Sequence, residues 1–460
     1  MNILELLKPG GKTALIQGGK SITYSELLDA GLKFGGVLRR KGIKKGGHVL
    51  VFMPLSIELY TAMIGAWSIG AAAIFIDFSR GSAFVDSSIE RLKPDIIVCD
   101  GVTGIVRNIY PKMRRVKAIN IARKGDFVEI EKVDKEHPAI LTFTSGTTDL
   151  PKVAVRTHGF LINQYKALCG HIDFDENHVD LGTLAVFTLA NLAANMTTLL
   201  PDKSYRSKIN PAKLARQIQR HGVTRAICSP ALMGKLLNHS PLSDVKSMYL
   251  GGGPVYPGLL KRISKDVDLH IVYGSTEAEP ISGVRWFGIS PEDKEKIARG
   301  EGLLVGHVVP EVECKIGGGK EILVSGETVL KGYLGGFGDK ENKIHEGGKT
   351  WHRTGDAGYL DELGRLWLLG RVNEAIHDEK GELHPFCIEC ILDTNHGIRG
   401  AILTKDGERT VTIEKTSAKP ADILNTLKPH RITQVIEIKK IPMDKRHGAK
   451  IDYEKLRTIL

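Results

Sequence analysis

The sequence predicts an α/β protein whose core is a doubly wound, mostly parallel β-sheet. Short apolar runs alternate along the chain with helical patterns, and strands that alternate with helices are typical of parallel sheets. Ligands bind such sheets at the carboxyl ends of the strands, so the loops after these runs are candidate sites. The helices expected include residues 56–69 and 211–221. The runs expected to form buried strands are residues 49–53, 73–76, 96–98, 140–143, 226–228 and 271–273.

The pattern changes after about residue 303. Short alternating strands at residues 312–316, 321–324 and 366–369, with glycine-rich turns between them, predict a small antiparallel β subdomain over about 303–370. A boundary is expected at Gly370 and Arg371. We therefore expect a large N-terminal domain, residues 1–370, followed by a small α+β C-terminal domain, residues 371–460.

Length and composition are those of a globular protein with several hydrophobic cores. The chain has 460 residues, of which 42% are hydrophobic and 25% are charged, and these proportions exclude a disordered chain. The formal net charge of +11 is compatible with a nucleic acid, with membrane headgroups or with a polyanionic small substrate. The cations look evenly spread, and no zinc-finger or RNA-binding spacing is present. We therefore expect no nucleic-acid partner.

Cysteines and long apolar stretches indicate the compartment. The six cysteines are scattered and nothing at the N-terminus resembles a signal peptide, so we expect a cytoplasmic protein. The one close pair, Cys387 and Cys390, lacks the two further ligands that a zinc site needs. Residues 62–76 are too short to span a membrane, and residues 181–200 contain Asn and several Thr. Both stretches are predicted to be buried elements, and no membrane span is expected.

A candidate phosphate-binding loop follows the strand expected at 140–143. It reads Thr-Phe-Thr-Ser-Gly-Thr-Thr-Asp-Leu-Pro-Lys over residues 142–152. Glycine lets backbone N–H groups approach an anion, hydroxyls donate further hydrogen bonds, and lysine supplies charge. It is not a Walker loop, because Gly-Lys-Thr at 11–13 and 348–350 lacks a glycine five residues earlier. The candidate residues are Thr144, Ser145, Gly146, Thr147, Thr148 and Lys152.

Two more loops follow short apolar runs, so three strand-end loops are expected to converge on one crevice. These two are Gly-Gly-Gly-Pro at 251–254 and Tyr-Gly-Ser-Thr-Glu at 273–277. Thr-Gly-Asp at 354–356, Gly-Arg at 370–371 and a late lysine, Lys450, come afterwards. This ordered set resembles the adenylate-forming superfamily, which includes acyl-CoA synthetases and the adenylation domains of peptide synthetases. The resemblance runs from Ile-Thr-Tyr-Ser-Glu-Leu at 22–27 to Lys450 and Ile451.

The resemblance implies an ATP site made from these loops. Residues 144–148 and Lys152 would grip the β- and γ-phosphates of ATP. Tyr273 would stack on the adenine, and Gly274, the next residue, would belong to the same adenine site. Asp356 would accept both ribose hydroxyls, and Arg371 would donate to the same sugar. One wall of the adenine and acyl pockets would be formed by Gly251, Gly252, Gly253 and Pro254.

The resemblance also implies which residues act on the reacting groups. Thr276 would donate its hydroxyl to the α-phosphate, and Glu277 would bind Mg²⁺. Lys450 would lie between the attacking carboxylate and the α-phosphate and stabilise the charge that grows there. The C-terminal domain that carries Lys450 would be mobile, with a hinge at Asn373. The acyl pocket would draw on Phe187, Asn191 and Met233.

The sequence departs from the family pattern at two points. Asp149 stands where the family usually has glycine, and its charge is expected to weaken or re-aim the phosphate loop. Ala449 lies between Gly448 and Lys450, whereas the common ending has glycine directly before the lysine. The ending around Lys450 resembles the branch that contains the β-lactone synthetases of bacterial olefin biosynthesis. Residues 180–183, 229–232 and 351–360 resemble that branch too.

The implied function is activation of a fatty or other hydrophobic carboxylic acid with ATP and Mg²⁺, which yields an acyl-adenylate and pyrophosphate. The second step expected is thioester formation with coenzyme A or a carrier-protein pantetheine, so the protein would be an acid–thiol ligase. Gly381, Pro385 and Glu389 resemble the segment that lines the pantetheine tunnel. The alternative is β-lactone formation from a 3-hydroxy acid. A third hypothesis is a nucleotide-binding protein without turnover.

Overall fold

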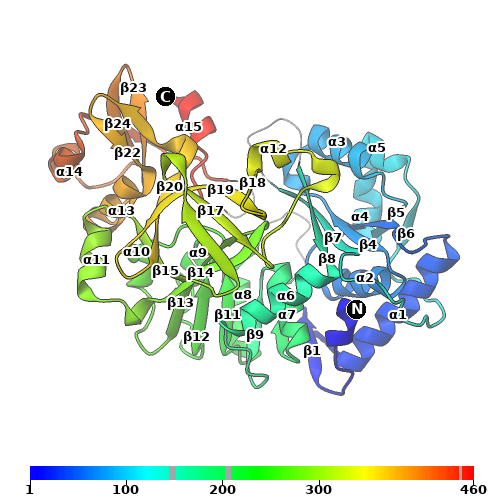
Figure 1. Ribbon diagram of the computed structural model, residues 1–460. Helices are drawn as coiled ribbons and strands as arrows, with labels where there is room; N and C mark the ends of the chain where they lie inside the picture. The colour runs from blue at the N-terminus through cyan, green and yellow to red at the C-terminus, as the bar shows by residue number, and fades with distance from the viewer. Residues whose placement is uncertain (145–151, 203–208, 445–447) are drawn as a thin grey trace. The chain divides into compact units, whose positions relative to one another are not determined.

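The structure, a computed structural model, describes residues 1–144, 152–202, 209–444 and 448–460. Contacts within the chain divide it into two units. Unit 1 consists of Met1–Cys228 and Glu327–Lys343, and unit 2 consists of Ser229–Gly326 and Ile344–Leu460. Both units mix helices with sheets, which confirms the predicted α/β class (Figure 1). The predicted domains, residues 1–370 and 371–460, stay a prediction.

Unit 1 contains a six-stranded sheet in the order β6-β5-β3-β4-β7-β8, in which β8 alone runs antiparallel to its neighbour. The strands are β3 (His48–Phe52), β4 (Ala72–Phe75), β5 (Ile96–Cys99), β6 (Ala118–Asn120), β7 (Pro138–Thr144) and β8 (Lys152–Thr157). The helices around it are α1 (Tyr24–Arg40), α2 (Ile57–Ser68), α3 (Ser82–Leu92), α4 (Gly101–Val106), α5 (Pro111–Arg114) and α6 (His158–Cys169).

Both faces of this sheet are buried, as parallel strands require. On β3, Val49 and Val51 belong to one core cluster, together with residues of α1 and α2. Leu50 and Phe52 belong to a second cluster, together with residues of α3. Successive side chains of a strand point to opposite faces, so the two clusters cover the two sides. The four strands predicted between residues 49 and 143 are confirmed.

A second group of strands in unit 1 has the order β11-β9-β10-β1-β2 and is parallel except for β2. Its elements are β1 (Thr13–Gln17), β2 (Lys20–Thr23), β9 (Val179–Gly182), α7 (Ala185–Ala193), β10 (Thr197–Leu199), α8 (Pro211–Arg220) and β11 (Arg225–Cys228). Residues 62–76 and 181–200 form largely buried elements of unit 1, as predicted. Among the described residues, no helix has the length and apolarity to cross a bilayer.

The main sheet of unit 2 has the order β16-β17-β19-β20-β15-β14-β13-β12. β12 and β13 are parallel, and from β13 onward each strand is antiparallel to its neighbour. The predicted antiparallel strands after residue 303 therefore continue the sheet of β12–β14. The strands are β12 (Ser247–Leu250), β13 (Asp268–Ser275), β14 (Ala278–Arg285), β15 (Leu303–Val308), β16 (Val312–Ile316), β17 (Glu321–Gly326), β18 (Lys343–Glu346), β19 (Lys349–Leu360) and β20 (Arg365–Arg371).

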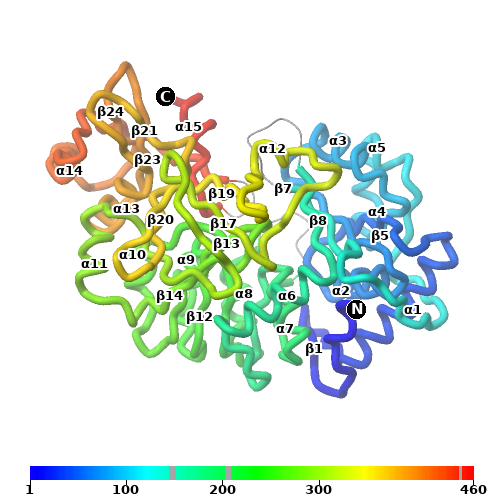
Figure 2. Tube along the Cα trace, viewed as in Figure 1, coloured from blue at the N-terminus to red at the C-terminus, as the bar shows by residue number. Residues whose placement is uncertain are grey.

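The C-terminal part of unit 2 adds a hairpin, a three-stranded sheet and helices. The hairpin is β21 (Ile376–Asp378) with β22 (Gly381–Leu383), and the sheet is β23 (Gly400–Lys405), β24 (Glu408–Glu414) and β25 (Gln434–Ile438). The helices of unit 2 are α9 (Pro230–Leu236), α10 (Pro257–Leu260), α11 (Pro291–Ala298), α13 (Pro385–His396), α14 (Pro420–Leu427) and α15 (Tyr453–Ile459). Helices α10 and α11 both pack against α13, as the trace in Figure 2 shows.

Candidate active site

Two glycine-containing loops of unit 2 leave the sheet side by side. β12 and β13 are parallel neighbours, with Leu250 opposite Ile271, so the loops that follow them start at the same edge. A Cβ atom on Gly251 would lie 2.8 Å from the carbonyl oxygen of Val272. Only glycine therefore lets the first loop pass this close to β13. Within unit 2, the structure brings together residues 251–254 and 273–277, as the sequence predicted for these two loops.

Tyr273, Asp356 and Arg371 form one polar cluster beside these loops. The Tyr273 hydroxyl donates to Oδ2 of Asp356 at 2.9 Å, and Nε of Arg371 lies 3.3 Å from Oδ1. Asp356 on β19 and Arg371 on β20 are direct cross-strand partners. Burial, and then the Asp356 carboxylate, raise the pKa of Tyr273 well above its usual range. The hydroxyl thus stays protonated and orients the carboxylate.

The turn that carries Asp356 is held by a residue that the sequence reasoning missed. Gly355 has φ of +70°, and its N–H donates to Oε1 of Glu321 at 3.2 Å. The second oxygen of Glu321 accepts from Nε of Arg353 at 2.7 Å. Glu321 is only 5% exposed. A charged residue at the start of an otherwise apolar strand was the one signal for it in the sequence.

Thr276 and Glu277 lie in the turn that connects β13 to β14. The Glu277 N–H donates to Oγ of Ser275 at 3.3 Å, which helps to shape the turn. The Glu277 carboxylate is close enough to Arg371 to contribute to the raised pKa of that guanidinium, after the larger effect of Asp356. Both residues of the turn are half-buried. Unit 2 therefore places the predicted metal ligand beside the predicted ribose site.

The segment that carries Lys450 folds back on itself and rests on the first loop. Oδ1 of Asp444 accepts from the N–H groups of Ala449 and Lys450 at 2.8 and 2.7 Å. Met443 and Ile451 pair across the base of this turn. A Cβ atom on Gly253 would lie 2.5 Å from Cβ of Ala449. The alanine that departs from the family ending thus fits because residue 253 has no side chain, and Lys450 is exposed next to the loop.

The phosphate loop belongs to unit 1. Residues 145–151, including Ser145, Gly146, Thr147, Thr148 and Asp149, lie outside the described residues. Thr144 ends β7 and Lys152 begins β8 as its cross-strand partner, so the loop connects a β-hairpin. The predicted strand-to-loop transition is thus present. Binding of the ATP phosphates by this loop stays a prediction.

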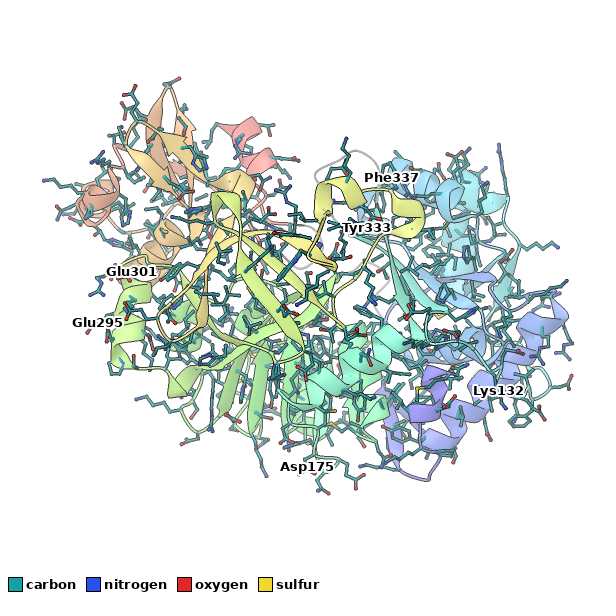
Figure 3. The ribbon with its side chains drawn as sticks, in the orientation of Figure 1. Lys132, Asp175, Glu295, Glu301, Tyr333 and Phe337 are labelled. Atoms are coloured by element: carbon teal, nitrogen blue, oxygen red, sulfur yellow. The ribbon has the colours of Figure 1, made fainter. Side chains whose placement is uncertain are left out.

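Lys152 is buried against the segment of unit 1 that spans residues 327–343. Its Nζ donates to Oδ1 of Asn342 at 2.8 Å and lies 5.6 Å from the centre of the Tyr333 ring. Tyr333 stands in the same segment as Phe337, as Figure 3 shows, and the Arg91 guanidinium covers the Phe337 ring. The segment contains η6 (Leu334–Gly336) and α12 (Asp339–Asn342). Lys152 therefore ties one end of the phosphate loop to this segment.

Comparison with known proteins identifies the family. The family model described as AMP-binding enzyme matches residues 6–334. The chain belongs to the AMP-binding enzyme family. This confirms the predicted adenylate-forming family, and with it activation of an acid through an adenylate as the reaction class.

Relatives of this AMP-binding enzyme are named for two different activities. It is 25% identical to the olefin β-lactone synthetases of Stenotrophomonas maltophilia and Xanthomonas campestris, over 90% and 97% of this chain and 87% and 93% of theirs. It is also 25% identical to 2-succinylbenzoate–CoA ligase of Oceanobacillus iheyensis, over 86% of this chain and 83% of the relative.

Solved structures of the same fold cover the whole AMP-binding enzyme. ATP-bound MatB from Rhodopseudomonas palustris superposes with a TM-score of 0.84 at 19% identity and covers 100% of this chain and 99% of its own. O-succinylbenzoate coenzyme A synthetase from Bacillus subtilis, in complex with ATP and magnesium, gives 0.81 at 20% identity over 99% and 98%. At such identities these structures confirm the fold.

The residues predicted for the acyl pocket are distributed over both units. Phe187 and Asn191 lie on α7 of unit 1, and Met233 lies on α9 of unit 2; all three are buried. The amide of Asn191 donates to Oδ2 of Asp180 at 2.7 Å and to Oγ1 of Thr198 at 3.1 Å. Asn191 is thus part of a buried polar network of the AMP-binding enzyme. An acyl pocket lined by these three residues stays a prediction.

The predicted hinge lies in a short turn. Asn373 belongs to η7 (Val372–Glu374), between β20 and β21. The next residue, Glu374, pairs with Arg457 of α15. Burial raises the pKa of the Glu374 carboxyl, and Arg457 opposes this shift. This ion pair connects the hinge turn to the helix that follows Lys450, a contact that the sequence analysis did not anticipate.

A buried carboxyl group links the Lys450 segment to the first glycine loop. Glu389 of α13 accepts hydrogen bonds from Tyr256, which follows the 251–254 loop, and from Tyr453, three residues after Lys450. The Tyr453 bond measures 2.9 Å. Burial raises the pKa of Glu389 to about 7, and the two tyrosines and Arg399 lower it in part. The resemblance places Glu389 in the segment that lines a pantetheine tunnel, which stays a prediction; in the structure its carboxyl is bonded to both tyrosines.

Replacing Glu389 by glutamine is expected to change how stability depends on pH. The ordinary pKa of this group is 4.5 and the folded value is about 7, so between these values the folded state binds more protons than the unfolded state. Its contribution to stability is therefore largest below about pH 4.5 and is lost as the pH rises through 7. One pKa unit corresponds to about 1.4 kcal/mol. Over this pH range the free energy of unfolding of the wild type should therefore fall by up to about 3 kcal/mol more than that of Glu389→Gln.

Urea unfolding at several pH values between 4.5 and 8 measures this difference. The matched control is Glu362→Gln, which removes an exposed carboxylate from the turn between β19 and β20 of the same unit. The control should keep the pH slope of wild type. If Glu389→Gln kept that slope as well, Glu389 would not hold an extra proton in the folded protein.

Proposed function

We propose that this AMP-binding enzyme activates a hydrophobic carboxylic acid with ATP and Mg²⁺ and then passes the acyl group to the thiol of coenzyme A or of a carrier-protein pantetheine. In the first step a carboxylate oxygen bonds to the α-phosphorus and pyrophosphate leaves. In the second step the sulfur bonds to the carbonyl carbon, AMP leaves and the thiol proton is released. The observation that supports the first step best is the contact of Ala449 with Gly253, because it puts Lys450 beside the strand-end loops of unit 2.

Each side chain of unit 2 has a separate task in this proposal. Lys450, exposed beside the 251–254 loop, stabilises the negative charge that accumulates as the carboxylate meets the phosphate. Asp356, oriented by Tyr273, accepts the ribose hydroxyls. Glu277 would hold Mg²⁺, and the half-buried turn fits it, because Mg²⁺ is commonly bound by one or two carboxylates together with substrate phosphates. When bound there, the ion would supply positive charge that stabilises the leaving pyrophosphate.

A second candidate for the second step is β-lactone formation. It is supported by the two β-lactone synthetases that are similar over 90% and 97% of the chain. In this reaction the 3-hydroxyl oxygen of the substrate bonds to its own activated carbonyl carbon, AMP leaves and the hydroxyl proton is released. The reaction needs a 3-hydroxy acid and no thiol.

The decisive experiment measures acid-dependent pyrophosphate release over plain and 3-hydroxy fatty acids, with and without coenzyme A, and identifies products by mass. Turnover of plain acids that requires the thiol and yields thioesters supports the ligase. Thiol-independent turnover limited to 3-hydroxy acids, with a product lighter by one water, supports the lactone synthetase. ATP binding without pyrophosphate release from any acid overturns both, and Asp149→Gly then tests whether this residue blocks the phosphate loop.

Replacing Asp356 by asparagine is expected to raise the KM for ATP by about tenfold or more, because hydrogen bonds to charged groups are stronger than neutral ones. The substitution keeps the shape of the side chain and removes its charge beside Arg371. Initial rates of pyrophosphate release against ATP concentration measure the effect. Asp361→Asn is the matched control, since Asp361 also binds an arginine and an aromatic side chain on the same hairpin. An unchanged KM in Asp356→Asn would remove the ribose assignment.

A further inference from the structure

Four exposed aliphatic side chains lie along one short helical stretch of unit 1. Helix α4 continues directly into η3 (Arg107–Ile109). Val102, Ile105, Val106 and Ile109 are 43%, 73%, 36% and 65% exposed. Their spacing of i, i+3, i+4 and i+7 places them on one side of the helix. Of the ten large hydrophobic side chains exposed among the described residues, four are on this stretch, and such a patch marks an interaction surface.

The surroundings of this stripe are strongly basic. Seven Lys and Arg residues, and no Asp or Glu, lie between Asp100 and Asp126. The even spread of cations expected from the sequence is therefore wrong for this part of the chain. Five of the seven are exposed: Arg114, Arg115, Lys117, Arg123 and Lys124. Arg123 and Lys124 line a hollow with Val37, Arg40 and Lys41 at the end of α1. We call the four aliphatic residues, Arg114, Arg115 and Lys117 the α4 face.

One contact places a cation beside the end of the stripe. Nε of Arg114 donates to the carbonyl oxygen of Asn108 at 2.6 Å, which holds Arg114 next to Ile109. At the other end, the Ile121 N–H donates to the carbonyl oxygen of Cys99 at 2.9 Å. The end of β6 therefore lies beside the start of α4. β6 is the edge strand of the sheet, with α4 and α5 nearby in Figure 1.

We propose that the α4 face docks on an anionic lipid surface. Aliphatic side chains reach the boundary between headgroups and acyl chains, while the flanking cations contact lipid phosphates, as in helices that lie in the membrane interface. A nucleic acid would bind the cations but has no use for four aliphatic side chains, because base recognition relies on aromatic stacking and hydrogen bonds. A second copy would bring two basic faces together, and like charges repel.

This interaction does not depend on the reaction that the protein catalyses. If the proposed function holds, docking would bring the enzyme to the membrane, into which hydrophobic acids partition. Binding to lipid is measured without turnover, so its failure and a failure of the proposed function are distinguishable. The helical stretch is too short to span a bilayer, so the proposal is a surface contact.

Cosedimentation with vesicles tests the proposal. We expect the full chain to bind equimolar phosphatidylcholine–phosphatidylglycerol vesicles, to bind pure phosphatidylcholine far more weakly, and to lose affinity as salt is raised. The variant Ile105→Ser/Ile109→Ser should bind about a hundredfold more weakly, because burying each large aliphatic side chain strengthens binding by about tenfold. Arg115→Gln/Lys117→Gln should bind about thirtyfold more weakly, at roughly fivefold for each cation near the surface.

Matched controls separate the α4 face from general hydrophobicity and charge. Leu363→Ser removes an aliphatic side chain that is 67% exposed in the turn between β19 and β20. Lys439→Gln/Lys440→Gln removes two exposed lysines of unit 2. Both controls should keep wild-type lipid affinity, and thermal unfolding should show that all variants fold like wild type.

Several outcomes would overturn the proposal. One is the absence of binding to anionic vesicles at low salt, and another is equal binding by wild type and Ile105→Ser/Ile109→Ser. Binding of polyglutamate but not of vesicles would assign the face to an acidic protein, and binding of RNA or DNA instead of vesicles would assign it to a nucleic acid. If the wild type formed a dimer and did not bind vesicles, and Ile105→Ser/Ile109→Ser abolished the dimer, the α4 face would be a contact between two copies of the chain.

Discussion

Replacing Lys450 by alanine is expected to reduce acid-dependent pyrophosphate release by about 10²–10³-fold, the usual effect of removing one group that stabilises developing charge. ATP affinity should stay nearly unchanged, because the proposed contact strengthens only as the carboxylate meets the phosphate. The loss should therefore appear in kcat. The fold should remain intact, because Asp444 accepts hydrogen bonds from the backbone N–H groups of Ala449 and Lys450 and their side chains are not needed for it.

Two measurements make this prediction specific. The second step, started from a synthetic acyl-adenylate, should proceed in Lys450→Ala at close to the wild-type rate, since the charge on the phosphate has already been formed. Lys455→Ala, five residues further along the same basic tail, is the matched control and should keep full activity. Full adenylation by Lys450→Ala would remove Lys450 from the proposed mechanism.

The contact under Lys450 can be tested through its neighbour. The methyl group of Ala449 fills the space next to Gly253. A Cβ atom at residue 253 would lie only 2.5 Å from that methyl group. Ala449→Val should therefore displace the segment and lower adenylation while Lys450 is still present. Gly448 has φ of +61° and faces open space, so the displacement should arise at Gly253 and not within the turn.

Replacing Arg225 by methionine is expected to lower the free energy of unfolding by about 3–5 kcal/mol, the range for breaking a buried ion pair. Arg225 and Asp180 are both 0% exposed, with Nε 2.8 Å from Oδ1. The guanidinium also donates to Asn191 and to the carbonyl oxygen of Asp173. Removal of the arginine leaves the Asp180 carboxylate without its cation. Urea unfolding monitored by circular dichroism measures the loss.

A double substitution separates the pair from its surroundings. Arg225→Met/Asp180→Leu removes both charges, so it should recover a large part of the stability that Arg225→Met loses. Arg220→Met, on the exposed end of α8, is the matched control and should change stability by less than about 0.5 kcal/mol. If Arg225→Met unfolded like this control, the buried pair would contribute nothing to stability.

Asn191 shows why a site assigned from sequence needs the fold. A resemblance placed Asn191 in the acyl pocket, but its side chain bonds Asp180, Thr198 and Arg225. Asn191→Ala should therefore lower stability. If Asn191 lined the acyl pocket and had no structural role, Asn191→Ala would change substrate preference and leave stability unchanged. The partners of a buried amide lie up to 34 residues away in the chain, and local sequence carries no signal for them.

The secondary structure was largely readable from the chain because local patterns encode it. Apolar runs of three to five residues predicted β3, β4, β5 and β7, and the strand predicted at 312–316 is β16, Val312–Ile316. The helix predicted at 56–69 is α2, Ile57–Ser68. The glycines at 251–253 were readable as well: Gly251 passes close to the backbone of β13, Gly252 has φ of +78°, and Gly253 leaves room for Ala449. Side-chain periodicity and glycine act over a few residues, which is the range that a sequence pattern covers.

The sequence by itself thus determined the α/β class, the strands of the central sheets, the loops at their carboxyl ends and the family. Tertiary structure alone decided how the side chains are used: that Glu389 is buried between two tyrosines, that Lys152 is packed under residues 327–343, and that the aliphatic side chains of α4 face outward. The pKa of a carboxyl and the exposure of an isoleucine depend on what surrounds them. Those surroundings come from segments far apart in the chain, so only the folded protein sets them.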